Sequence, residues 1–345
     1  MMVPFMGPEA EQMNFHAIAR HVAFATILTG AAPLWADPLL SVAGTMDASE
    51  DYAVVLDALD AIDADATNLT LYWDLMAPDG AYAPDPDWPA IANLIYPAAD
   101  LQVSLNIAVV DMVADRRPVA LQQRAFSDPE VIAAFDEFLT TVMAAMPDVT
   151  FTSIGIGNEV DGYLDDVTID EYAVFFAAAS DTIHRLAPEV PVGMTVTWDG
   201  LEDNPQIQAL AALGDVWMIN YYPLTPEFQA RDPRNTAADL VDMLAMAGRK
   251  PVFLTEAGYP SGGCGASEAM QLAFVQQVDQ FAAANAAKMP LVTYVWLHDL
   301  SEESVTAYAD YYGNPSECFS AFLGTLGLRS HTGRDKAAYS WLRNR

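Results

Sequence analysis

Basic residues are scarce in this sequence. Its 345 residues include 15 Lys and Arg against 47 Asp and Glu, and the formal net charge at pH 7 is −32. A surface of that sign repels the phosphates of nucleic acids and anionic lipid head groups, and it disfavours polyanionic polymers such as pectin. We therefore expect no nucleic-acid partner. Hydrophobic residues make up 52% of the chain, which is typical of a folded globular protein rather than a disordered one.

The sequence also lacks the signatures of metal and cofactor sites. It has five His, without HxH or HExxH spacing, and no GxGxxG or Walker motif. The acidic run Asp161–Asp166 lacks the ligand order of a calcium loop, so we expect a solvated loop there. No GxSxG motif surrounds Ser261, which argues against a serine hydrolase. We expect neither a metal nor a cofactor.

A basic residue, a short apolar run and a small residue follow one another near the N-terminus. Arg20 precedes an apolar run over 22–28, and Ala36 lies at the end of the segment. The run is shorter than the about 20 apolar residues of a membrane span, and this order is typical of a secretory signal peptide. We expect residues 1–36 to be a signal peptide with translation starting at Met13; the alternative is a buried N-terminal helix. Cleavage would remove two acidic residues and one basic residue and leave a net charge of −31.

Eight apolar, β-rich runs follow this segment and alternate with helical patterns. The runs cover 39–46, 68–73, 103–110, 152–157, 192–198, 216–222, 252–256 and 291–297, and the helical segments include 51–62, 129–146, 169–187 and 267–287. Such alternation predicts a parallel sheet, and eight units fit a (β/α)8 barrel. A doubly wound sheet is the alternative, but it would require a glycine-rich loop after the first strand. We expect one α/β domain, a single TIM barrel, over residues 37–345.

Two helix starts are marked by capping residues. Asp128 precedes Pro129, which suits an N-cap followed by proline in the first turn. Thr168 and Glu171 have the spacing of a capping box. We expect helices to begin at both places.

Two carboxylates follow directly after apolar strands of the predicted barrel. Glu159 comes after the fourth strand and Glu256 ends the seventh. The active site of such a barrel lies at the carboxyl ends of its strands, where an unpaired buried charge would be costly. Two carboxyls about 5–5.5 Å apart, flanking a glycosidic bond, are the machinery of a retaining glycosidase. One ionised Glu also raises the pKa of its neighbour and keeps it protonated as the acid.

The residues around these carboxylates resemble a known group of enzymes. The Gly-Asn-Glu motif ending at Glu159 and the Thr-Glu pair ending at Glu256 resemble those of the large clan of retaining (β/α)8 glycoside hydrolases. The segment 255–263 is similar to the nucleophile segment of β-1,3-glucanases (laminarinases). The resemblance implies that Glu159 is the acid/base and Glu256 the nucleophile. It also implies that Asn158 hydrogen-bonds the sugar 2-hydroxyl.

A tyrosine at the end of the sixth strand is a candidate partner of the nucleophile. We expect the Tyr222 hydroxyl to orient Glu256, with packing as its alternative role. Tyr221 takes its place if the strand register shifts by one residue.

Aromatic side chains at other strand ends are candidates for substrate binding. We expect Trp296 and Trp73 to stack on a sugar ring, because the C–H faces of sugars are apolar; core packing is the alternative for each. His298 is a candidate for substrate contact, with a role in loop structure as the alternative. Trp198 and Trp217 are expected to serve in packing, with a place in the lining of the cleft as the alternative for Trp198.

The chain has two cysteines, Cys264 and Cys318. An even pair in an exported protein indicates a disulfide, and both residues lie in predicted loops after neighbouring strands at the same rim. No Cys follows the N-terminal apolar run, so we expect no lipid or membrane anchor. The sequence therefore predicts a secreted or periplasmic protein with one disulfide.

Together these features predict a retaining glycoside hydrolase that cleaves a neutral β-linked oligo- or polysaccharide. The resemblance suggests β-glucan or β-galactan, and we expect a monomer. The alternative is a non-catalytic carbohydrate-binding barrel that has lost turnover. Aldolase chemistry lacks support, because none of Lys250, Lys288 and Lys336 ends a strand.

Overall fold

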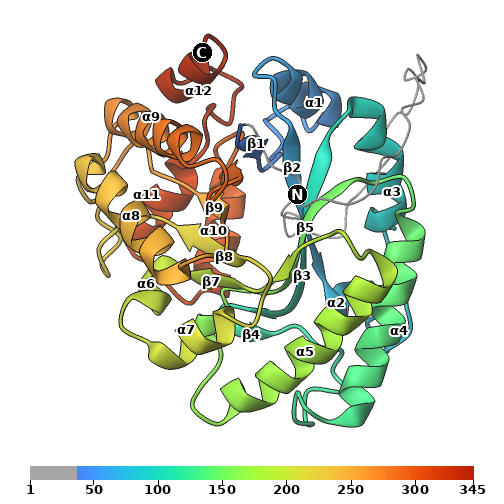
Figure 1. The fold of residues 1–345 in the computed structure, drawn as a ribbon. Helices are drawn as coiled ribbons and strands as arrows, with labels where there is room; N and C mark the ends of the chain where they lie inside the picture. The colour runs from blue at the N-terminus through green and yellow to red at the C-terminus, as the bar shows by residue number, and fades with distance from the viewer. Residues whose placement is uncertain (1–36) are drawn as a thin grey trace.

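Parallel strands form the centre of the computed structural model, which describes residues 37–345 (Figure 1). The strands are β1 (Leu39–Val42), β2 (Ala66–Tyr72), β3 (Gln102–Asp111), β5 (Phe151–Asn158), β6 (Val192–Gly193), β7 (Thr195–Thr197), β8 (Trp217–Tyr221), β9 (Val252–Ala257) and β10 (Leu291–Tyr294). A two-residue strand, β4 (Ala114–Asp115), pairs antiparallel with β3. All eight predicted strands are present, and the fifth consists of the two pieces β6 and β7.

The hydrogen-bonded order of the strands is that of a barrel. It runs β6-β5-β3-β2-β1-β10-β9-β8-β7. Only Met194 separates β6 from β7, so the two ends of this order belong to one stretch of chain and the sheet curls back on itself. The predicted (β/α)8 barrel is thus confirmed.

Helices surround the sheet (Figure 1). The helices that follow successive strands are α1 (Tyr52–Asp60), α3 (Trp88–Ile95), α4 (Pro129–Ala145), α5 (Thr168–Leu186), α7 (Pro205–Ala211), α8 (Thr236–Ala247), α9 (Glu268–Ala284) and α12 (Ala337–Leu342). Shorter elements in the loops are α2 (Trp73–Met76), α6 (Trp198–Glu202), α10 (Glu302–Tyr311), α11 (Glu317–Thr325) and the 3-10 turns η1 (Pro97–Ala99), η2 (Val160–Gly162) and η3 (Pro233–Asn235).

The two predicted helix starts are correct in position, but only one has the predicted cap. Asp128 accepts a hydrogen bond from the Glu130 amide at the start of α4. At the start of α5, Asp165 accepts from the amide of Thr168. The capping-box prediction is therefore wrong, because Glu171 instead accepts from the amide of Phe126 in another segment.

The inside of the barrel is polar. A small space beneath the strand ends is lined by Asn68, Thr70, Ser104, Leu105, Asn106, Gly155, Asn158, Thr195, Met218, Asn220, Thr255 and Glu256. Alternate residues of a strand point to opposite faces, so Ser104 and Asn106 face inward, whereas the Leu105 side chain between them belongs to the apolar core. Outward residues such as Leu69, Leu71 and Ile107 join the main apolar core with the helices. The barrel interior therefore supplies hydrogen-bonding groups directly beneath the strand ends.

Cys264 and Cys318 form the predicted disulfide. Their Cα atoms lie 5.5 Å apart, and the bond joins the loop after β9 to α11. It fixes the α10–α11 segment, which belongs to the long connection after β10, against the barrel rim. Within residues 37–345, no helix combines the length and apolar character needed to cross a bilayer.

Candidate active site

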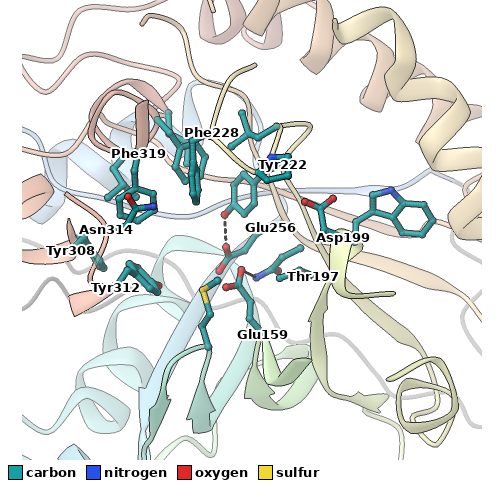
Figure 2. A pocket seen from close by; sticks show the side chains of 18 of the residues that line it. Glu159, Thr197, Asp199, Tyr222, Phe228, Glu256, Tyr308, Tyr312, Asn314 and Phe319 are labelled. Atoms are coloured by element: carbon teal, nitrogen blue, oxygen red, sulfur yellow. Dashed lines mark hydrogen bonds between the residues drawn. The ribbon is translucent and has the colours of Figure 1, made fainter. Parts of the chain in front are cut away.

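A pocket of about 400 Å³ opens at the carboxyl ends of the strands (Figure 2). Its lining comes from residues at or just beyond the ends of β3, β5, β7, β8, β9 and β10 and from the α10–α11 segment. The polar lining residues are Asn158, Glu159, Thr197, Asp199, Asn220, Thr225, Glu256 and Asn314, and the aromatic ones are Trp198, Tyr222, Phe228, Trp296, Tyr308, Tyr312, Phe319 and Phe322.

Glu159 reaches this pocket through an unusual turn at the end of β5. Gly157 has a φ of +84°, and an added Cβ would collide with Tyr172 and Val160, so only glycine fits. Glu159 itself has a φ of 47°, in the left-handed region that costs a non-glycine residue energy. Its carboxyl is buried, and Oε1 accepts a hydrogen bond of 3.0 Å from Asn220 Nδ2.

Glu256 lies within β9 and faces Glu159. The Tyr222 hydroxyl donates a hydrogen bond to Glu256 Oε2 (Figure 2). Figure 2 shows the two carboxyl groups at the centre of the pocket, and the charge of Glu256 acts on the Glu159 carboxyl. The structure places Tyr222, rather than Tyr221, on the carboxylate; the Tyr221 hydroxyl donates to Asp239 instead, at 2.6 Å.

The surroundings of the two carboxyls give them different pKa values. Burial, and then the charge of Glu256, raise the pKa of Glu159 well above its usual value. Burial also raises the pKa of Glu256, to about 7, but the Tyr222 hydroxyl opposes that rise by stabilising the charged form. Glu256 therefore ionises first, while Glu159 keeps its proton.

Asn158 is held in one orientation by a chain of hydrogen bonds. Its Nδ2 donates to Asp111 Oδ1 at 2.9 Å, and its Oδ1 accepts from Asn106 Nδ2 at 3.2 Å. Asp111 in turn accepts from the Tyr311 hydroxyl at 2.8 Å. Burial raises the pKa of Asp111. This chain connects the floor of the pocket with α10, which carries Tyr311.

Sequence reasoning gave no role to Asn220 or Asp111. Thr255 Oγ1 donates to Asn220 Oδ1 at 2.9 Å, which turns the Asn220 amide nitrogen toward Glu159. Asp111 ends β3 much as Glu256 lies at the end of β9, so the same strand-end rule would have found it. Asn220 could not be found in this way, because its role depends on the register that pairs it with Glu256 across β8 and β9.

Trp296 lines the pocket, as its predicted stacking role requires. Trp296 as a whole is 97% buried, and its ring stacks on that of Tyr308 with centroids 6.1 Å apart and an angle of 29° between the planes. Trp198, expected to serve in packing, also lines the pocket at the start of α6. Trp217 packs in the main core, as expected.

Two predicted substrate contacts are corrected by the structure. Trp73 begins α2, and its ring turns away from the mouth into the core, 4.8 Å from the ring of Phe135. His298 is completely buried; its Nδ1 bonds the Thr45 carbonyl oxygen at 2.7 Å, and its Nε2 accepts from Arg329 at 3.1 Å. Its role is in loop structure, the alternative recognised from the sequence.

The acidic run after Glu159 also differs in part from expectation. Asp161 is largely buried, and its carboxylate accepts hydrogen bonds from the Thr197 amide at 2.8 Å and the Thr197 hydroxyl at 2.6 Å. It therefore anchors the end of β7 beside Glu159 rather than facing solvent. Within the described part of the chain, no group of three or more His, Cys, Asp or Glu side chains is arranged to hold a metal ion.

Comparison with known proteins gives structural likeness only. No protein-family model and no curated protein sequence matches the chain. A variant of GH5_18 from Streptomyces cattleya in complex with Manb1-4GlcNAc is similar over 89% of this chain and 80% of that one, with 21% identity and a TM-score of 0.70.

Two further solved structures show the same likeness. GH5_18 from Bifidobacterium longum has 17% identity and a TM-score of 0.70 over 89% of this chain and 78% of that one. The exo-beta-1,4-mannosidase Op5Man5 from Opitutaceae bacterium strain TAV5 has 15% identity and a TM-score of 0.64 over 89% of this chain and 59% of that one. At such identities the likeness shows the fold, and the chain shares its (β/α)8 barrel with these glycoside hydrolases.

Proposed function

We propose that the protein is a retaining glycoside hydrolase acting on a neutral β-linked sugar by double displacement. The observation that carries the proposal is the pair of buried carboxyls, Glu159 and Glu256, which face one pocket from different strands. Burial and the charge of Glu256 raise the pKa of Glu159, whereas the Tyr222 hydroxyl opposes the effect of burial on Glu256, and this difference favours a protonated Glu159 beside an ionised Glu256. A retaining glycosidase needs one group of each kind.

In the first step the Glu256 carboxylate attacks the anomeric carbon. The bond from that carbon to the leaving oxygen breaks, and Glu159 gives its proton to this oxygen. The product is a glycosyl ester on Glu256 with inverted anomeric configuration. The Tyr222 hydroxyl holds the carboxylate in place before the attack.

In the second step Glu159, now ionised, takes a proton from water. The water oxygen attacks the anomeric carbon, and the ester bond to Glu256 breaks, which restores both carboxyls and the original configuration. Asn220 Nδ2 keeps the Glu159 carboxyl at the same position in both steps.

The walls of the pocket support a neutral substrate. Its lining within residues 37–345 includes three acidic side chains, Glu159, Asp199 and Glu256, and no Lys or Arg. An anionic sugar would be repelled without compensation. A structural neighbour is described in complex with Manb1-4GlcNAc, which supports a neutral β-linked sugar here as well.

Replacing the nucleophile tests the proposal. Glu256→Gly is expected to lose nearly all turnover, and added azide should enter the vacated space and attack the anomeric carbon. One displacement replaces two, so the product is a glycosyl azide of inverted configuration, identified by NMR. Wild-type activity in this variant would contradict the assignment.

Replacing the acid/base gives a matched comparison. Glu159→Gly should still be glycosylated by substrates with a good leaving group, because these need little acid assistance. The glycosyl-enzyme then accumulates, and azide releases it as a product of retained configuration. Opposite stereochemistry in the two variants would mean that the two roles are exchanged.

We also propose that the protein is exported and acts as a monomer, with residues 1–36 as the signal peptide and residues 37–345 as one catalytic domain. Residues 1–36 lie outside the described part of the chain. The Cys264–Cys318 disulfide supports an oxidising location. Mass analysis of the secreted protein should find an N-terminus near Asp37, and ultracentrifugation should give the mass of one chain; an intact N-terminus in a cytoplasmic pool would contradict export.

A further inference from the structure

One side of the pocket is formed by side chains without hydrogen-bonding atoms. We call this side the apolar wall: Leu224, Phe228, Phe319, Phe322, Leu323 and Leu326. Its rings pack on one another, with centroids 4.7 Å apart between Phe228 and Phe319 and 5.8 Å between Phe228 and Phe322. The Cys264–Cys318 disulfide ties α11, which carries two of these rings, to the rim.

Several oxygen atoms beside the apolar wall are already engaged. The Tyr222 hydroxyl donates to Glu256. Thr225 Oγ1 donates to Glu227 at 3.0 Å and accepts from the Gln229 amide at 3.3 Å, while Asn314 Oδ1 accepts from the Ser316 amide. A sugar hydroxyl placed against the rings of the wall would therefore lose water and meet mainly carbon atoms and oxygen atoms that are already bonded.

The backbone of Phe228 adopts a strained conformation. Its φ of 58° lies in the left-handed region, which is unusual for a bulky residue. Strain of this kind persists where the surrounding structure enforces it and often marks a functional contact. Figure 2 shows Phe228 and Phe319 together on one side of Glu256.

The opposite side of the pocket is polar. Asn158 lines it, held by Asp111 beneath. Hydroxyls of a bound sugar thus have partners on this side.

Sugar chemistry and the two carboxyls fix how a ring fits between these sides. The leaving group must lie toward Glu159, which protonates it, and the anomeric carbon toward Glu256. A pyranose carries its hydroxyls at C2, C3 and C4 along one edge, while the ring oxygen and C5 form the other. The hydroxyl-bearing edge matches the Asn158 side, so C5 and its substituent face the apolar wall.

We propose that the site prefers a 6-deoxyhexose, with Phe228, Phe319 and Phe322 as the residues that determine this specificity. The inference rests on the proposed glycosidase function. A methyl group at C5 buries apolar surface against the wall, whereas the C6 hydroxyl of an ordinary hexose would be left unpaired there. A site of this type should favour the 6-deoxy sugar by about tenfold or more in kcat/KM.

The test compares 4-nitrophenyl β-glycosides that differ only in the C6 oxygen, in the gluco, galacto and manno series. For the wild type, the 6-deoxy member of each hydrolysed pair should have the higher kcat/KM, mainly through a lower KM. Equal or better hydrolysis of the hexose member, with dependence on Glu256, would overturn the specificity and leave the glycosidase function intact. No hydrolysis of any glycoside would overturn both.

A matched pair of variants assigns the effect to the apolar wall. Phe228→Asn offers a hydrogen-bonding group and suits the left-handed backbone, so the ratio of kcat/KM between the 6-deoxy sugar and the hexose should fall. Phe228→Leu keeps the wall apolar and should preserve this ratio. Thermal unfolding verifies that both variants fold. If Phe228→Asn leaves the preference unchanged and instead weakens octyl relative to methyl glycosides, the wall contacts the leaving group and the inference is wrong.

Discussion

At the scale of single residues, two chemically identical side chains acquire different pKa values from their surroundings. The Tyr222 hydroxyl donates to Glu256 Oε2, and this bond is stronger when the carboxyl is charged, which favours ionisation. Glu159 feels the resulting negative charge, and its burial leaves it protonated. At Glu159, burial and the charge of Glu256 outweigh the bond from Asn220, and at Glu256 the phenolic donor opposes burial; these differences would separate the proposed acid from the proposed nucleophile.

Removing the phenolic donor should shift the pH dependence of the reaction. In Tyr222→Phe, Glu256 loses the bond that favours its charged form, so its pKa rises from about 7. The acidic limb of the kcat/KM profile should move to higher pH by about one unit or more, and kcat at neutral pH should fall. Tyr221→Phe is the control, because the Tyr221 hydroxyl bonds Asp239; equal shifts in both variants would contradict the pairing.

The buried carboxyl of Glu256 should also lower the stability of the fold. Burial raises the folded-state pKa of Glu256 from 4.5 to about 7, so the folded protein binds this proton more tightly than the unfolded chain. The penalty is absent below pH 4.5 and grows until about pH 7, where it reaches about 3 kcal/mol. Glu256→Gln should therefore be more stable than the wild type to urea at pH 8 and equally stable at pH 4.5.

An exposed glutamate provides the control for that measurement. Glu137 lies on the solvent side of α4, and Glu137→Gln should change the free energy of unfolding little at either pH. If Glu256→Gln were no more stable than the wild type at pH 8, the raised pKa would be refuted.

The structure places a side chain where the sequence predicted it when that side chain stays in line with its strand. Glu256 lies within β9, so its direction follows from the strand. The prediction for Trp73 failed because the chain turns into α2 at that residue and places the ring in the core. The prediction for His298 failed because Arg329, in the last segment of the chain, bonds its imidazole. Neither the turn at Trp73 nor the packing of a distant segment on His298 can be predicted from the local sequence pattern.

At the scale of elements, the strands were predictable because each is a short apolar run bounded by turns. The bounds of β2, β3, β5, β8 and β9 differ from the predicted ones by at most two residues. The apolar wall was not predictable. Phe319 and Phe322 belong to α11, far along a connection from any strand end, and only tertiary packing places them beside Glu256.

The disulfide should stabilise both the fold and the apolar wall. It closes a loop with a sequence separation of 54 residues, and loss of such a crosslink costs about 4 kcal/mol in the chain-entropy model. The double variant Cys264→Ala, Cys318→Ala should unfold at lower urea concentration. Its KM should rise more than its kcat falls, because α11 carries Phe319 and Phe322 but no catalytic carboxyl.

Chemical reduction separates the crosslink from the side-chain replacements. A phosphine reductant should lower the stability of the wild type to that of the double variant and leave the double variant unchanged. Unaltered wild-type stability after complete reduction, verified by thiol counting, would show that the crosslink contributes nothing.

At the scale of the whole molecule, the excess of acidic residues has the largest expected effect on stability. With 47 acidic and 15 basic residues, at least 32 acidic side chains cannot have a basic partner of their own. Some of the few basic side chains are engaged in buried pairs, such as Lys336 with Asp299 at 2.6 Å, and cannot neutralise carboxylates on the surface. The unpaired acids repel one another across the surface and oppose the compact state.

Salt should therefore stabilise the protein at neutral pH. The Debye length falls from about 30 Å at 0.01 M to about 3 Å at 1 M ionic strength, which removes most repulsion between exposed carboxylates. We expect Tm at pH 7 to rise by about 5 °C between 0.02 and 0.5 M NaCl, equivalent to roughly 2 kcal/mol. At pH 4 many carboxylates are protonated, so the same addition should raise Tm much less. An increase of equal size at both pH values would indicate a general effect of salt on apolar burial, and an unchanged Tm at pH 7 would show that surface repulsion does not limit the stability of this barrel.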